Sequence, residues 1–175
     1  MTLPAVHLIP LGICLGVAAV RDIAQRKIPN TLTVSVATLG IGVQWWDNGW
    51  LAALSGVAAA LLTVIVLYRP WLAGGVGGGD VKLAAAVATW IGLGHLTSFA
   101  LVTALAGGLV AAVCYVLSGR EAREQIGGNL VGAALLRELP IIDREAAAVH
   151  RRVSVPYGIA IAAGGALALW APWGL

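Results

Sequence analysis

The hydrophobic residues of this 175-residue chain gather in six long runs that are separated by shorter polar segments. A helix that crosses the hydrocarbon core of a bilayer needs roughly 20 mostly apolar residues. Most of the runs approach that length, although the fourth is short unless residues before it also enter the membrane. The pattern therefore predicts an all-α polytopic membrane protein with six transmembrane helices, at 3–20, 31–46, 50–68, 81–93, 97–117 and 156–173.

The segment 119–153 is the one extended polar stretch. It carries six arginines and five acidic residues, with leucines and isoleucines interspersed. Such a mixture is typical of an amphipathic segment that lies on the inner membrane surface, although it would also suit a segment that guides a substrate. We therefore expect residues 1–175 to form a single integral membrane domain, with 119–153 as a cytoplasmic amphipathic loop within it.

The composition agrees with a membrane protein. Hydrophobic residues make up 59% of the chain and charged residues 11%, which excludes an ordinary soluble domain. The net charge of +3 comes from basic residues scattered at the ends of apolar runs. We therefore expect membrane lipid around the chain and no nucleic acid as a partner.

The basic residues predict how the chain is oriented. All eleven lysines and arginines lie after the first, third and fifth runs, ten of them in the loops and Lys82 at the very start of the fourth run. Because cytoplasmic loops carry an excess of such residues, these loops are predicted to be cytoplasmic and both termini to lie outside. Trp45, Trp46 and Trp50 cluster at one extracytoplasmic turn, as in an aromatic belt at the interface.

A glycine-rich stretch ends in an acid between the third and fourth runs. Five of the residues 74–79 are glycine, and Asp80 follows. We expect Gly77, Gly78 and Gly79 to belong to a loop that, without Cβ atoms, can take positive φ angles and can let an extended peptide pair with its backbone. An ionisable residue near the bilayer is a functional-site hypothesis. Its predicted partner is Asp22, in the short loop after the first run.

Two aspartates held close together would form an acid–base pair. They do not both ionise readily, so that one keeps a proton at neutral pH. The ionised member can take a proton from water while the protonated member donates to a carbonyl oxygen. Such a pair hydrolyses a peptide bond without a metal or a cofactor, and we expect neither here.

Simpler interpretations of the same residues remain open. Asp80 would serve as the N-cap of the fourth helix, Lys82 would extend its amine to the membrane surface, and Asp22 would be an ordinary polar loop residue. Asn30 is the predicted N-cap of the second helix. Membrane acids also occur in proton- or cation-coupled transporters, and a non-catalytic assembly scaffold is a third hypothesis.

Three motifs resemble one known family. Gly77-Gly78-Gly79-Asp80 is similar to the GxGD signature of intramembrane aspartyl proteases. The run from Asp80 to Leu83, together with Asp22 and the upstream Ile28-Pro29-Asn30, resembles the type IV prepilin peptidases. Pro156-Tyr157-Gly158 is similar to their Pro-aromatic-Gly motif.

The resemblance implies an endopeptidase that removes the short basic leader from prepilin-like precursors at the cytoplasmic face of the bacterial inner membrane. It implies Asp22 and Asp80 as the catalytic dyad, and roles in substrate binding or in the loop for Gly77, Gly78, Gly79, Lys82, Pro156, Tyr157 and Gly158. The compact form looks like the peptidases of Flp-type, tight-adherence pili. Without a cysteine tetrad, N-methyltransferase activity is not expected. Archaeal preflagellin peptidases are also similar.

Overall fold

The computed structural model describes residues 5–25, 29–72, 76–117 and 157–170, and nearly all of them are helical. Each predicted apolar run contains one helix, which confirms the all-α fold class. The elements are α1 (Ala5–Gln25), α2 (Asn30–Asn48), α3 (Trp50–Leu72), α4 (Gly78–Ile91), the 3₁₀ turn η1 (Leu93–His95), α5 (Leu96–Leu117) and α8 (Tyr157–Trp170). The predicted amphipathic segment 119–153 lies outside the described residues.

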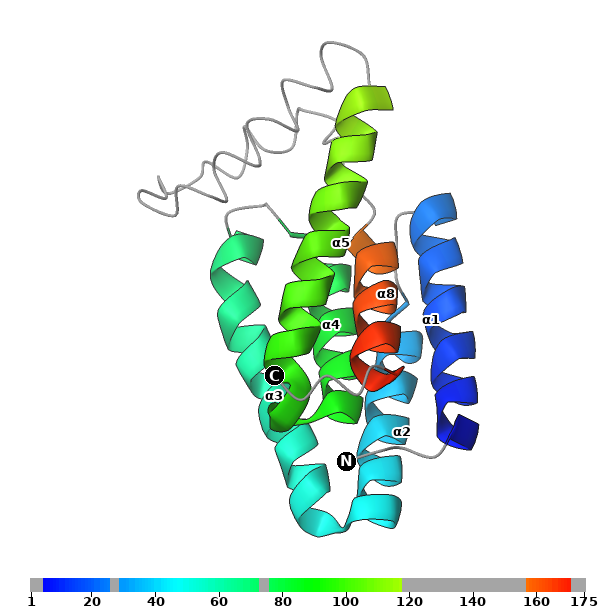
Figure 1. Cartoon of the computed structure of the whole chain (residues 1–175), viewed down its shortest axis with the longest axis vertical. Coiled ribbons are helices and arrows are strands. Elements are labelled where there is room, and N and C mark those ends of the chain that lie inside the picture. The colour runs from blue at the N-terminus through cyan, green and yellow to red at the C-terminus, as the bar shows by residue number, and fades with distance from the viewer. Residues whose placement is uncertain (1–4, 26–28, 73–75, 118–156, 171–175) are drawn as a thin grey trace.

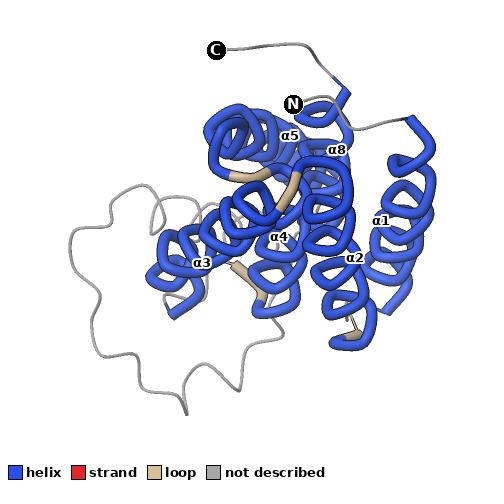
Figure 2. Tube along the Cα trace, turned by 90° about the horizontal axis from the view of Figure 1, so that it is seen from below, coloured by secondary structure: helices blue, strands red, loops and turns tan. Residues whose placement is uncertain are grey.

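Successive helices alternate in direction along one bundle (Figure 1). The helices α1, α3 and α5 end at the same end of the bundle at which α2, α4 and α8 begin. We call this the Asp80 end, because Asp80 lies in the first turn of α4. Figure 2 shows α4 among α2, α3, α5 and α8, with α1 on the outside next to α2 and α8.

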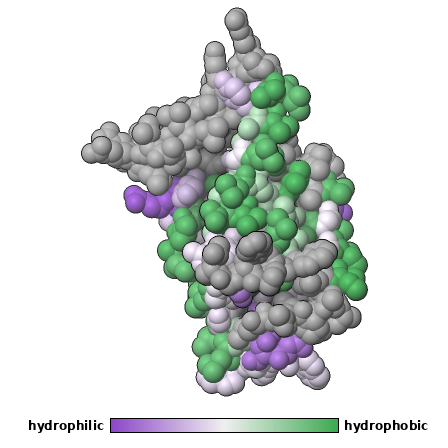
Figure 3. Space-filling model, viewed as in Figure 1, coloured by the Kyte–Doolittle hydropathy of each residue, from purple (hydrophilic) through white to green (hydrophobic). Residues whose placement is uncertain are grey.

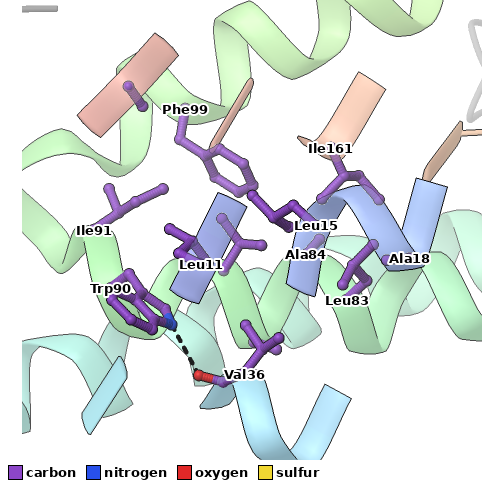
Figure 4. Packing of buried hydrophobic residues seen from close by; sticks show 13 residues of the cluster. Leu11, Leu15, Ala18, Val36, Leu83, Ala84, Trp90, Ile91, Phe99 and Ile161 are labelled. Carbon is purple, nitrogen blue, oxygen red and sulfur yellow. Dashed lines mark hydrogen bonds between the residues drawn. The ribbon is translucent and has the colours of Figure 1, made fainter. Parts of the chain in front are cut away.

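The helix α4 is the centre of the core. From Leu83 onward nearly all of its side chains are buried, and Trp90 is 1% exposed. Figure 4 shows Leu11 and Leu15 of α1 and Ile161 of α8 packed with residues of α4 in one apolar cluster. The indole Nε1 of Trp90 donates a hydrogen bond of 2.8 Å to a backbone oxygen of α2. A buried indole N–H needs such a partner.

Two glycines allow α2 and α3 to approach α4 closely. A Cβ placed on Gly40 of α2 would lie 2.5 Å from Cδ1 of Trp90, and it would also collide with the hydroxyl of Thr89. A Cβ on Gly56 of α3 would collide with the backbone oxygen of Thr89. Larger residues at these positions would push the helices apart, so the central position of α4 depends on both glycines.

Polar groups at the end of the bundle opposite the Asp80 end are paired. The side chain of Gln44, which is 3% exposed, donates a hydrogen bond of 2.7 Å to the backbone oxygen of Trp90. The backbone N–H of Leu93 donates to the hydroxyl of Ser55 at 3.0 Å. Gly92 links α4 to η1 with a φ of 67°, a left-handed conformation that favours glycine. These bonds fix the turn after α4 to α2 and α3.

Two of the described helical segments are long and apolar enough to cross a membrane. They are Trp50–Leu72 and Leu93–Leu117, each with a mean hydropathy of 2.3 over its most apolar window. Only 22% and 11% of these windows are buried, whereas the core helix of a soluble protein is mostly buried. Figure 3 shows hydrophobic residues along the outer side of α5. The outward faces of these two helices therefore suit contact with lipid.

The other predicted spans do not meet the same criterion. Ile9–Ala18 and Tyr157–Leu169 are apolar but shorter, and α4 has 14 residues. Because α4 is enclosed by other helices, its length is not set by the thickness of a bilayer. The tryptophans Trp45, Trp46 and Trp50 are 66%, 89% and 65% exposed around the turn between α2 and α3, as expected of side chains in an interfacial belt.

Candidate active site

Asp80 is a buried acid at the start of the central helix. It is the third residue of α4, and its side chain is 8% exposed. Gly77 occupies the N-cap position without any side-chain capping bond. The interpretation of Asp80 as the N-cap is therefore wrong. An acid in the first turn still interacts favourably with the helix dipole, which gives Asp80 one structural role in α4.

The glycines before Asp80 differ from the predicted loop. Gly78 and Gly79 are the first two residues of α4, and among the described residues only Gly49 and Gly92 have positive φ. The prediction that Gly78 and Gly79 lie in a loop is therefore wrong, because glycine permits many conformations and selects none of them. What Gly77 provides is space, since a Cβ at this position would lie 2.7 Å from Oδ2 of Asp80.

Asp22 lies in a helix and not in the predicted loop. The helix α1 continues past residue 20, where the first apolar run was predicted to end, and reaches Gln25. Position 22 continues the stripe of α1 that buries Leu11, Leu15 and Ala18, because it follows Leu15 by seven residues, or about two turns. The side chain of Asp22 lies outside the described part of the structure.

One contact of α8 sets the relative level of the two aspartates. A Cβ on Gly165 would lie 2.7 Å from Cγ1 of Val87 in α4 and 3.6 Å from Cδ1 of Leu15 in α1. Asp80 precedes Val87 by seven residues and Asp22 follows Leu15 by seven. Since α1 and α4 run in opposite directions (Figure 1), both steps lead about 10 Å towards the Asp80 end. Positions 22 and 80 therefore lie at about the same height along the bundle.

Lys82 connects the first turns of two helices. Its exposed side chain donates a hydrogen bond of 2.9 Å from Nζ to Oδ1 of Asn30. The N-cap position of α2 is occupied by Pro29, so the prediction of Asn30 as N-cap is wrong. Asn30 is the first residue of α2, and its side-chain oxygen binds Lys82. This bond ties the start of α4 to the start of α2, next to Asp80.

The Pro-aromatic-Gly motif reaches the same end of the bundle. Tyr157 is the first residue of α8 and is partly buried, Gly158 is buried, and Pro156 lies outside the described residues. The ring of Tyr157 packs against α5, where a Cβ on Gly107 would lie 3.2 Å from Cε1 of Tyr157. The phenol also interacts electrostatically with the carboxyl group of Asp80. The first residue of α8 thus belongs to the same end of the bundle as Asp80.

The sequence analysis missed two residues of this region. One is Gly107, whose only signal was a pair of glycines inside an apolar run. The other is Trp71, at the end of α3, whose indole Nε1 would lie 3.2 Å from a Cβ on Gly78. Trp71 also packs against Tyr68, with a distance of 5.7 Å between the ring centroids. This aromatic pair borders the first turn of α4.

Comparison with known proteins decides the family. The chain matches the type IV leader peptidase family over residues 9–112, which is more than half of its length. The chain belongs to this family. The matched segment contains Asp22, Gly77, Asp80 and Lys82, whereas Tyr157 lies beyond it. The resemblance to prepilin peptidases is therefore confirmed.

Two relatives of this type IV leader peptidase family member carry the name prepilin leader peptidase/N-methyltransferase. The protein from Bacillus subtilis is 35% identical over 124 residues, which cover 70% of this chain and 48% of the relative. The protein from Xanthomonas campestris is 29% identical over 107 residues, which cover 57% of this chain and 37% of the relative. The chain thus matches less than half of the length of either relative. No solved structure matches the chain.

Proposed function

We propose that this member of the type IV leader peptidase family is an aspartyl endopeptidase that cleaves the leader from prepilin-like precursors. The observation that carries the proposal is that positions 22 and 80 lie at about the same height along the axis of the helix bundle. Both positions continue helix stripes that are otherwise apolar and buried, so that each acid stands where core packing alone favours a hydrophobic residue. Family membership supports the peptidase chemistry.

The proposed chemistry uses the pair as acid and base. The ionised carboxylate accepts a proton from a water molecule, whose oxygen attacks the carbonyl carbon of the scissile peptide bond. The protonated carboxyl donates its proton to the carbonyl oxygen. When the tetrahedral intermediate collapses and the C–N bond breaks, the carboxyl that took its proton from water donates it to the leaving nitrogen, and the other carboxylate takes a proton from a hydroxyl of the intermediate. No covalent enzyme intermediate is formed, and both carboxyl groups return to their starting protonation states.

We also propose that the enzyme spans the bacterial inner membrane six times, with the Asp80 end facing the cytoplasm and both termini outside. Arg21, Arg69 and Lys82, the basic residues in the described part of the chain, belong to helix ends at the Asp80 end, which supports this orientation. The scissile bond of a membrane-anchored precursor would then meet Asp80 at the inner surface of the bilayer, where the leader emerges from the lipid.

The test is cleavage of a prepilin precursor co-expressed with the enzyme. Conversion of precursor to mature pilin is followed by the change in electrophoretic mobility, and the cleavage site is read by mass spectrometry. We expect Asp22→Asn and Asp80→Asn each to lower the rate at least about 100-fold, since an amide cannot exchange the proton. The matched control is Asp47→Asn, because Asp47 is an exposed acid in the last turn of α2.

The outcomes separate the dyad from the rest of the proposal. Loss of cleavage in both variants, with normal cleavage by the Asp47→Asn enzyme, is the expected result. Normal processing by either the Asp22→Asn or the Asp80→Asn enzyme would overturn the assigned dyad. An intact precursor in the presence of the unmodified chain, at confirmed expression of both proteins, would overturn the peptidase function itself.

A further inference from the structure

Tyr157 is held in place by the packing of its ring. A Cβ on Gly107 of α5 would lie 3.2 Å from Cε1 and 3.3 Å from Cδ1 of the ring, so one edge of the ring rests on bare backbone. Gly107 is buried, while Tyr157 is only partly buried. The neighbouring Gly108 is exposed, and a Cβ there would have no neighbour within 4 Å. The position of Tyr157 therefore depends on a glycine at 107 and not at 108.

The register between α8 and α4 puts Tyr157 and Asp80 at nearly the same height along the bundle. Both helices begin at the Asp80 end and run in the same direction (Figure 1). They touch where Gly165 approaches Val87. Tyr157 precedes Gly165 by eight residues and Asp80 precedes Val87 by seven, steps of about 12 Å and 10 Å along the two helix axes. Tyr157 and Asp80 are therefore nearly level, and their side chains interact electrostatically.

Other titratable groups lie at this end of the bundle. The amine of Lys82 donates to Asn30, and the exposed bases are Arg21 on α1 and Arg69 on α3. The thiol of Cys114 on α5 also interacts with the phenol of Tyr157. The remaining groups are Tyr68 on α3, Tyr115 on α5 and, on α1, Asp22. Among them Tyr157 is the neutral oxygen donor that both interacts with Asp80 and has its ring fixed by packing.

We propose that Tyr157 is a positioning residue for Asp80: its hydroxyl donates a hydrogen bond to the Asp80 carboxyl during cleavage and sets which proton state that carboxyl adopts. The inference rests on the proposed function and adds a third group to the proposed dyad. A donor to a carboxylate favours its ionised form. Removal of the hydroxyl would therefore let Asp80 keep its proton to a higher pH.

The test compares Tyr157→Phe with the unmodified enzyme in detergent, using a purified prepilin precursor. Phenylalanine keeps the ring on Gly107 and removes only the hydroxyl. We expect kcat to fall about 10-fold with KM unchanged within about twofold. Because the pKa of Asp80 rises, one limb of the pH dependence of kcat moves to higher pH. A moved acid limb means that Asp80 must be ionised and is the general base. A moved alkaline limb means that Asp80 must be protonated and is the general acid.

Control variants distinguish positioning from packing. Tyr115→Phe, which removes an exposed hydroxyl from α5, and Cys114→Ala are expected to leave the pH profile unchanged. Gly107→Ala pushes the ring and lowers kcat, whereas Gly108→Ala has no such effect. The pH profile is decisive, because a loss of packing lowers the amount of active enzyme without moving either limb.

Each result has one meaning. A Tyr157→Phe enzyme with an unchanged pH profile overturns the inference, whatever its kcat, and leaves the dyad intact. A shift that appears equally in Cys114→Ala overturns it as well, since the thiol would then carry the effect. If the unmodified enzyme leaves the precursor uncleaved, the proposed function fails and this inference fails with it.

Discussion

Gly77 lies so close to the carboxylate of Asp80 that a Cβ at position 77 would come within 2.7 Å of Oδ2. The residue before the central helix thus limits where the buried acid can point. The backbone does not require a glycine at position 77, because a φ of −69° is allowed for any residue. The glycine is required because a side chain there would collide with the Asp80 carboxylate. The orientation of the Asp80 carboxylate therefore depends on the absence of a side chain at position 77.

We predict that Gly77→Ala lowers the rate of precursor cleavage at least about 10-fold, which corresponds to about 1.4 kcal/mol in the barrier. The added methyl group forces the Asp80 carboxylate to rotate away from its position. The matched control is Gly94→Ala, since a Cβ on Gly94 meets no atom within 4 Å and this residue lies at the opposite end of the bundle. Equal rates for the two variants would contradict the role of the contact.

Packing around α4 leads to a prediction about stability. Gly40→Ala would place a methyl group 2.5 Å from Cδ1 of Trp90, so we expect it to destabilise the protein by about 1–3 kcal/mol. Gly42, two residues further along α2, has open space around it. Gly42→Ala should be neutral or slightly stabilising because alanine favours the helix. Thermal unfolding in detergent micelles, followed by tryptophan fluorescence, measures both, and a similar midpoint for the two variants would contradict the packing.

That each apolar run contains a helix could be predicted from the sequence, but the ends of the described helices could not. An apolar run shows where side chains are kept from water, whereas a helix continues for as long as its backbone hydrogen bonds are made. The two therefore need not end at the same residue. The helix α1 therefore continues through the charged Arg21 and Asp22 to Gln25, and α4 begins at Gly78. An apolar run also does not distinguish a helix that faces lipid from one enclosed by its neighbours, as α4 is.

The candidate site was predictable in part. An acid beside a glycine-rich segment of a strongly apolar chain marks Asp80, and the sequence analysis predicted Asp22 as its partner. The shared level of the two residues depends on the contact of Gly165 with Val87 and Leu15. No local pattern reveals such a contact, because it joins three helices that are distant in sequence. The same holds for the packing of Tyr157 on α5.

The bond between Lys82 and Asn30 predicts how Lys82 contributes. If Lys82 acts through this bond, Lys82→Met and Asn30→Ala each lower the cleavage rate by less than about fivefold, and the double variant is no worse than either. If Lys82 instead adjusts the protonation of Asp80, Lys82→Met alone shifts the pH dependence of the rate. We expect the first result, measured as rate constants for the two single variants and the double variant across a range of pH.

The proposed orientation in the membrane predicts which surface positions a reagent reaches. After Cys14→Ala and Cys114→Ala remove the native thiols, single cysteines replace Asp47, Gly94 or Lys82, all of which are exposed. In spheroplasts a membrane-impermeant maleimide should label positions 47 and 94 but label 82 only after lysis, because the basic segments at the Asp80 end are retained in the cytoplasm. Labelling of position 82 before lysis would contradict the orientation, and with it the access of Asp80 to a leader on the inner side.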